Sequence, residues 1–178
     1  MATSEHAEDR LRARVTVAGD GNANVATGLP VLDHLLGTLA RYGSFDVELE
    51  VGPRGAEAEV AAAGQALGQA LAEPLRRSGV RGHGSAVVPA DEALAHVALE
   101  TSETPRVVAN VDLSDERIGG LGTDPVGSFL HELAETAGLN LHVRLIQGAE
   151  TEHVLETIFK GLGVALAQAC RPRRRERA

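Results

Sequence analysis

The chain has 178 residues, with 17 basic and 25 acidic side chains, so its formal net charge is −8 at pH 7. The acidic balance and an aromatic content of 2% argue against nucleic-acid binding, which needs positive charge for the backbone and rings for the bases. The single cysteine, Cys170, excludes a disulfide framework, and without a long apolar run or a secretory signal we expect a cytoplasmic protein that contacts neither nucleic acid nor membrane.

The first half of the chain predicts two strands, each followed by a helix. Apolar and polar residues alternate over 10–18 and over 45–51, the pattern of half-buried strands. The first helix opens at Pro30 and ends at Gly43. A longer helix with an apolar stripe is expected over 57–77.

The second half predicts a hairpin, a strand, a helix, another strand and a last helix. The hairpin turns near Asp91, and the first of the two helices has Asp124 as its N-cap and Gly138 at its end. These elements are expected at residues 84–101, 105–113, 124–138, 139–145 and 152–169.

The two halves of the chain match each other at a fixed offset. At an offset of 95 residues, Gly43 aligns with Gly138 and Gly68 aligns with Gly163. In the strands that follow Gly43 and Gly138, however, the apolar residues of one strand align with polar residues of the other. Such matching indicates an internal duplication. We therefore expect an α+β fold of duplicated helix–strand–helix units on small sheets. The expected divisions are a first half, a second half and a basic, disordered tail, at residues 1–82, 83–170 and 171–178.

Three polar residues share one face of the last predicted helix. His153, Glu156 and Lys160 follow the spacing i, i+3, i+7. Histidine and glutamate one turn apart can ligate Mn, Zn or Fe, and a lysine can hold a phosphate. The alternative is a solvated polar face. His142, on the polar side of the preceding strand, favours the functional interpretation.

Other candidates carry weaker signals. His34 is either a ligand or a histidine on a helix surface. Glu57 and Glu152, at matching positions of the two halves, could ligate a metal or simply act as negative charges at helix N-termini. The arginines between 171 and 177 could contact nucleic acid or a partner, or form a solvated end of the chain.

Several longer segments match one known family in order and in approximate spacing. They are TGLPVLDHLL at 27–36, GSFD at 43–46, ALGQAL at 66–71, GV at 79–80, PADE at 89–92, LNLHV at 139–143 and the residues from His153 to Lys160. On these segments the chain resembles the imidazoleglycerol-phosphate dehydratases of histidine biosynthesis. The resemblance implies a duplicated α+β fold, an assembly of twenty-four subunits, and active sites between subunits that hold two Mn ions.

The resemblance also implies roles for individual residues. The catalytic positions, where a carboxylate acts as base, fall on Glu8, Asp91 and Glu92. The phosphate of the substrate would be bound by Lys160. The metal ligands would be His34, His142, His153 and Glu156, with the metal supplying Lewis-acid stabilisation.

Other positions depart from the family pattern. Family ligands or phosphate-binding residues are replaced at Tyr42, Glu57, Ala58, Ala61, Gly82, Thr104, Ser128 and Glu152. Arg81 and Arg106 lie close to two of the lost arginine positions. Ligands and phosphate contacts are lost together while glycines and apolar positions persist, which is typical of a fold kept after its catalysis has been relaxed or redirected.

Three hypotheses follow from this pattern. The chain is a working dehydratase of unusual sequence, a non-catalytic paralogue that acts as scaffold or regulatory subunit, or a binder of a small anionic ligand with one metal or none. We expect one Mn ion per chain or none, and weak binding of substrate-like phosphates. We also expect a homo-oligomer, because ligands that cannot close a site within one chain need a neighbour.

Overall fold

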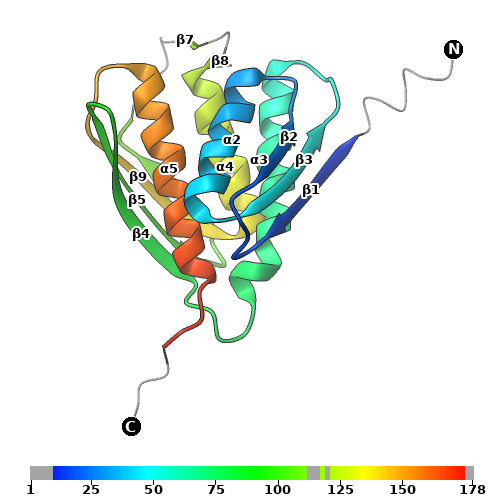
Figure 1. The fold of residues 1–178 in the computed structure, drawn as a ribbon, viewed down its shortest axis with the longest axis vertical. Helices are drawn as coiled ribbons and strands as arrows, with labels where there is room; N and C mark the ends of the chain where they lie inside the picture. Colours follow the sequence, from blue (N-terminus) through cyan, green and yellow to red (C-terminus); the bar gives the residue numbers. More distant parts are fainter. Residues whose placement is uncertain (1–9, 112–116, 119–120, 175–178) are drawn as a thin grey trace, which may run out of the picture.

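The computed structural model of the chain describes residues 10–111, 117–118 and 121–174. Its helices lie side by side between two small sheets (Figure 1). The helices are α2 (Pro30–Gly43), α3 (Ala56–Arg76), α4 (Thr123–Ala137) and α5 (Thr151–Cys170). The strands are β1 (Leu11–Thr16), β2 (Ala23–Ala26), β3 (Asp46–Val51), β4 (His83–Ala90), β5 (Ala93–Thr101), β6 (Arg106–Ala109), β7 (Arg117–Ile118), β8 (Leu121–Gly122) and β9 (Leu139–Gln147).

The two main sheets share one topology. In the first sheet, β3 lies between β1, to which it is antiparallel, and β2, to which it is parallel. In the second sheet, β9 lies in the same way between antiparallel β5 and parallel β6, and β4 is added at the edge beside β5. The predicted α+β fold of duplicated units is therefore confirmed. Strand β2 was not predicted from the sequence, because it has four residues and too little alternation to mark a strand.

Each sheet packs one face against the helices. The central strands bury every second residue, with Val47, Leu49 and Val51 on β3 and Leu141 and Val143 on β9. The helices turn apolar stripes toward these faces, and the two halves join in one core. Within the part of the chain that the structure describes, no helix has the length and apolar character needed to cross a membrane.

Each helix of the first half packs against a helix of the second half: α2 packs against α5, and α3 packs against α4. A glycine makes each contact possible. A Cβ on Gly163 would overlap the carbonyl oxygen of Leu39, and a Cβ on Gly68 would lie 2.9 Å from that of Leu133. Leu39 and Leu133 are therefore equivalent, 94 residues apart, whereas the two glycines are 95 apart. The single offset of 95 is thus wrong for α2 and β3, which match their counterparts in the second half at an offset of 94. This difference of one residue explains why β3 and β9 alternate out of phase when they are compared at an offset of 95.

Some predicted boundaries need correction. The left-handed residue that ends α2 is Ser44, with φ 52°, and its counterpart after α4 is Gly138, with φ 72°. Gly43 is the last residue of α2 and packs closely against α5, where a Cβ would lie 2.8 Å from the Gly163 carbonyl oxygen. Helix α4 begins at Thr123, so Asp124 lies inside the helix rather than at its cap.

The start of the basic tail is held against the body of the protein. The backbone N–H of Arg81 donates to the carbonyl of Arg171 (2.8 Å), and that of Arg173 donates to the carbonyl of Gly79 (2.7 Å). Residues 171–173 thus form a short antiparallel pairing with 79–81, and the disorder predicted from residue 171 is wrong for these residues. Residues 175–178 lie outside the described part of the chain.

Candidate functional site

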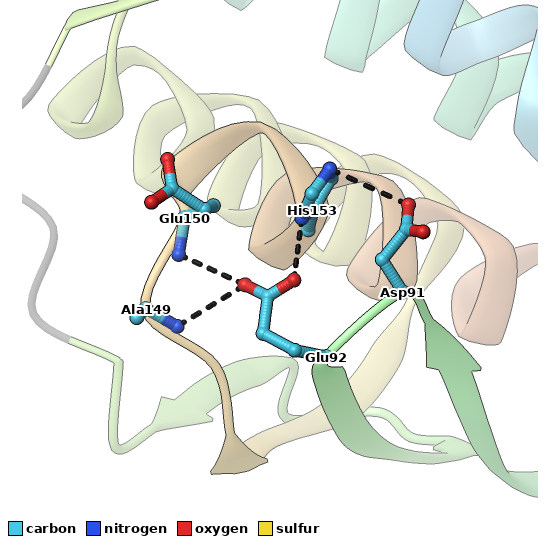
Figure 2. A network of polar contacts seen from close by, with 5 residues as sticks. All are labelled: Asp91, Glu92, Ala149, Glu150 and His153. Atoms are coloured by element: carbon cyan, nitrogen blue, oxygen red, sulfur yellow. Dashed lines mark hydrogen bonds and ion pairs between the residues drawn. The ribbon is translucent and has the colours of Figure 1, made fainter.

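The turn between β4 and β5 meets the first turn of α5 and gathers three of the predicted residues (Figure 2). His153 Nδ1 lies 2.5 Å from Glu92 Oε2, and His153 Nε2 lies 3.4 Å from Asp91 Oδ2. Asp91 adopts a left-handed backbone, with φ 50°, which lets the two carboxylates of the turn approach the same ring. Both nitrogens of His153 are therefore engaged by carboxylates.

Glu92 also accepts hydrogen bonds from backbone N–H groups at the start of α5. Its Oε1 accepts hydrogen bonds from the backbone N–H groups of Glu150 (3.0 Å) and Ala149 (3.4 Å), where the N-cap position of the helix has no side-chain bond of its own. The Glu150 N–H bond, together with other hydrogen bonds, lowers the pKa of Glu92 to about 2. The hydrogen bond that His153 donates to Glu92 in turn raises the pKa of His153. This network favours an imidazolium between two carboxylates.

Two other predicted ligands, His34 and Glu156, line a pocket between the first turns of α2 and α5, the α2–α5 pocket. Its volume is about 270 Å³. The remaining wall consists of Pro30, Val31, Leu35, Glu152 and Leu155. The pocket is thus an apolar cleft with one imidazole and two carboxylates at its edge.

Lys160 is occupied within the chain. Its Nζ donates to the carbonyl of Pro89 (2.8 Å) and lies 4.6 Å from the centre of the Tyr42 ring. The ammonium is thus partly satisfied by a backbone carbonyl and by the face of an aromatic ring.

His142 is separated from the other predicted ligands. It lies on β9 opposite Ala98 of β5, on the exposed face of the sheet. Helix α5 covers the other face, where Thr157 Oγ1 donates to the carbonyl of Val88. His142 and His153 are therefore on opposite sides of the sheet. Glu8 lies outside the described residues.

The described residues of one chain do not fit a Mn site. No three histidine, cysteine or carboxylate side chains among them are grouped so that they could hold a metal ion. Both nitrogens of His153 face carboxylates, and a ring nitrogen must give up such a bond before it can coordinate a metal. The expectation of one Mn ion per chain or none stays a prediction.

A further cluster was missed by the sequence analysis. Four arginines and a histidine line a pocket of about 700 Å³ at the end of α5, the arginine pocket: Arg81, His83, Arg171, Arg173 and Arg174, together with Pro172. The Nε of Arg173 donates to the carbonyl of Val80 (2.9 Å), which fixes the tail beside Arg81. The density of arginine after Cys170 was the available signal, but the pairing with residues 79–81 cannot be read from the sequence.

Comparison with known proteins decides the family. The family model for imidazoleglycerol-phosphate dehydratase matches residues 27–166. The chain belongs to this family. It is 41% identical to the imidazoleglycerol-phosphate dehydratase of Syntrophobacter fumaroxidans over 168 residues, covering 92% of this chain and 85% of the relative. The chloroplastic enzyme of Pisum sativum is 37% identical over 177 residues, covering 94% of this chain and 62% of the relative.

Solved structures of the dehydratase family share the fold. The imidazoleglycerol-phosphate dehydratase of Staphylococcus aureus superposes with a TM-score of 0.84 at 27% identity, covering 93% of this chain and 95% of that one. The enzyme of Pyrococcus furiosus gives a TM-score of 0.80 at 26% identity, covering 96% and 94%. The family resemblance and the fold are thus confirmed, and the chain is a homologue of dehydratases of histidine biosynthesis.

Proposed function

We propose that this member of the dehydratase family binds a phosphorylated small molecule and dehydrates imidazoleglycerol phosphate weakly or not at all. The observation that carries the proposal is the contrast between its two polar sites. Four arginines line one pocket, whereas the described residues contain no group of three metal-binding side chains. Anion recognition is therefore better supported than the metal-assisted reaction.

The arginine pocket suits a phosphate ester. Guanidinium groups donate paired N–H bonds that match phosphate oxygens, and they remain charged at any physiological pH. Four of them around one space repel each other unless an anion lies between them. Lys160, the phosphate ligand implied by the resemblance, already donates to the Pro89 carbonyl, so we assign the phosphate to the arginines first.

Self-association would bring the two polar regions together. The His153 network lies at the start of α5 and the arginine pocket at its end. Helix α5 (Figure 1) has 20 residues and therefore spans about 30 Å. One small ligand cannot touch both in the same chain. We therefore propose a homo-oligomer in which the arginine pocket of one copy faces the start of α5 in another.

The exposed face of the second sheet is the candidate contact surface. Three large apolar side chains are about half exposed on it, with relative exposures of 56% for Val87, 48% for Val108 and 52% for Ile146. His142 lies on the same face, next to Val108 of the neighbouring strand. A second copy that covers this face would bury those side chains and give His142 a role in a neighbour's site.

A residual dehydratase activity is the second candidate function, favoured by the His153 network. Elimination of water needs a group that takes a proton and a group that gives one. The hydrogen bond to Glu92 raises the pKa of His153 and so favours its protonated form, and the Asp91 carboxylate lies beside it. If this activity is absent, the remaining alternative is a scaffold or regulatory subunit.

Two measurements test the proposal. Dehydration by the purified protein with added Mn should be at least about a hundredfold slower than dehydration by the Syntrophobacter fumaroxidans relative. The reason is that the loss of a single group that stabilises the transition state lowers the rate by about that factor. Calorimetry with imidazoleglycerol phosphate should detect binding that weakens about tenfold in Arg81→Met or Arg174→Met. Arg12→Met, an exposed arginine on β1, is the control. Equal rates for the two proteins, or binding unaffected by the pocket variants, would overturn it.

A further inference from the structure

The arginine pocket gathers four positive charges that no carboxylate of the described residues balances. The ion pairs within the described part of the chain use other basic side chains, and none of them involves an arginine of this pocket. Carboxylates are not scarce, because the chain has 25 acidic residues and a net charge of −8. Four guanidinium groups around one space repel each other, so an anion that enters the pocket relieves this repulsion.

The backbone holds these arginines in place. The N–H of Arg81 donates to the carbonyl of Arg171, which joins the two segments that form the pocket. Arg173 is bound twice, through its backbone N–H to the carbonyl of Gly79 and through its Nε to the carbonyl of Val80. Side chains carried on a paired backbone lose less conformational entropy on binding than those of a free tail. The pocket is therefore preorganised for an anion.

The charge and the size of the pocket both exceed those of a single phosphate. A phosphate ester carries about two negative charges at pH 7, which is about half of what four guanidinium groups can balance. The volume of about 700 Å³ lies in the range of about 300–1,000 Å³ that is usual for pockets that enclose a whole ligand. Arg173 also borders a neighbouring pocket of about 530 Å³, whose wall includes Arg76 and Arg77. The cationic surface thus continues beyond the space that one phosphate would fill.

We propose that the arginine pocket binds a chain of three or more phosphate groups, either free or attached to a nucleoside. This inference rests on the proposed function and names the ligand class of the same pocket. Each phosphate of such a chain accepts the paired N–H bonds of a guanidinium group, and the chain carries enough negative charge for all four arginines. None of the residues that line the pocket is Phe, Tyr or Trp, so a base finds little surface for stacking. The phosphate chain is therefore the part that is recognised.

The test compares phosphate chains of different length. Sodium tripolyphosphate, ATP and orthophosphate are each titrated by calorimetry into the full-length protein at pH 7.5 without divalent ions. We expect tripolyphosphate to bind at least about tenfold more tightly than orthophosphate, because it contacts more of the guanidinium groups. ATP should bind about as tightly as tripolyphosphate. Added NaCl should weaken tripolyphosphate binding more than orthophosphate binding, because more charges are screened.

Variants place the binding in the pocket. Arg81→Met and Arg174→Met should each weaken tripolyphosphate binding about tenfold, whereas Arg12→Met, which removes an exposed arginine of β1, should leave it unchanged. Arg174 is exposed, so its substitution tests the charge without disturbing the core.

The outcomes separate this inference from the proposed function. Equal affinities for tripolyphosphate and orthophosphate, both reduced in Arg81→Met, would overturn the inference and leave phosphate binding in the pocket standing. ATP binding at least about tenfold tighter than tripolyphosphate would also overturn it, because the nucleoside would then be recognised. Binding of none of the three probes, or binding that the two pocket variants leave unchanged, would contradict both proposals.

Discussion

Glu92 links a hairpin turn to a helix through both of its oxygens. One oxygen accepts the N–H groups of Ala149 and Glu150, and the other meets His153. The carboxylate is ionised when it makes these contacts, as its lowered pKa of about 2 requires. A residue predicted to be catalytic therefore also holds the start of α5 in place.

Glu92→Gln should destabilise the fold in a pH-dependent way. The contribution of Glu92 is fully present above its unfolded pKa of 4.5 and is lost as the pH falls toward 2. The contribution of His153 is fully present below 6.5 and is lost as the pH rises through its raised folded pKa. The difference between wild type and variant in urea unfolding should thus be largest between about pH 4.5 and 6.5.

The exposed Glu135→Gln provides the control for this measurement. It should show little difference from wild type at any pH, because no shifted pKa depends on it. A Glu92→Gln difference that stays constant from pH 3 to 8 would contradict a role for ionised Glu92 and leave only the loss of a hydrogen-bond acceptor.

At the scale of elements, close contact between helices of different halves sets the geometry of the site. Gly163 lets α5 approach Leu39 of α2, and the same two helices form the α2–α5 pocket nearer their N-termini. The equivalent glycine, Gly68, lets α3 approach α4. The duplicated glycines are thus packing positions, and the pocket depends on one of them.

Gly163→Ala should destabilise the protein by about 1–3 kcal/mol, because the added methyl group has no space beside the Leu39 carbonyl. Gly37 is the matched control, since a Cβ there meets nothing within 4 Å in the same pair of helices. Gly37→Ala should leave stability unchanged or raise it by up to about 1 kcal/mol through helix propensity. Thermal unfolding of both variants checks the pair, and equal destabilisation would refute this packing role.

The elements were predictable from the sequence where their signal is local. Alternation marked β3 and β9, and Pro30 marked the start of α2. Contacts between distant segments were not predictable. The hydrogen bond between Glu92 and His153 joins residues 61 positions apart, and the arginine pocket depends on pairing of residues 171–173 with the segment 79–81. The family resemblance named most of these site residues but not their partners within the chain.

At the scale of the whole molecule, the distribution of exposed apolar side chains is uneven. Val87, Val108 and Ile146 lie on one face of the second sheet, whereas the outer face of the first sheet pairs Arg12 with Glu50 across its strands. The apolar side chains of the second sheet lose water favourably when a second copy covers them, whereas the charged Arg12 and Glu50 do not.

Val108→Glu and Ile146→Glu should therefore reduce self-association, because each places a charge in the proposed contact. Thr16→Glu, at an exposed position of β1, is the control. Light scattering at micromolar concentration should give an oligomer for wild type and the control, and smaller species for the two variants. A wild-type monomer would refute the proposed assembly, and an unchanged size of both variants would place the contact elsewhere.

Metal content should depend on this assembly. The described residues of one chain bring no three ligands together, and His142 faces away from His153, so a bound ion would need side chains from more than one copy. After dialysis against Mn, elemental analysis should give one ion per chain or none. Any bound Mn should be lost in the Val108→Glu variant, although this substitution adds a carboxylate and removes no metal ligand. Mn retained by a dissociated variant would show that a complete site forms within one chain. Two Mn ions per chain would contradict the expected metal content and would restore the metal-dependent dehydratase as the better account of this protein.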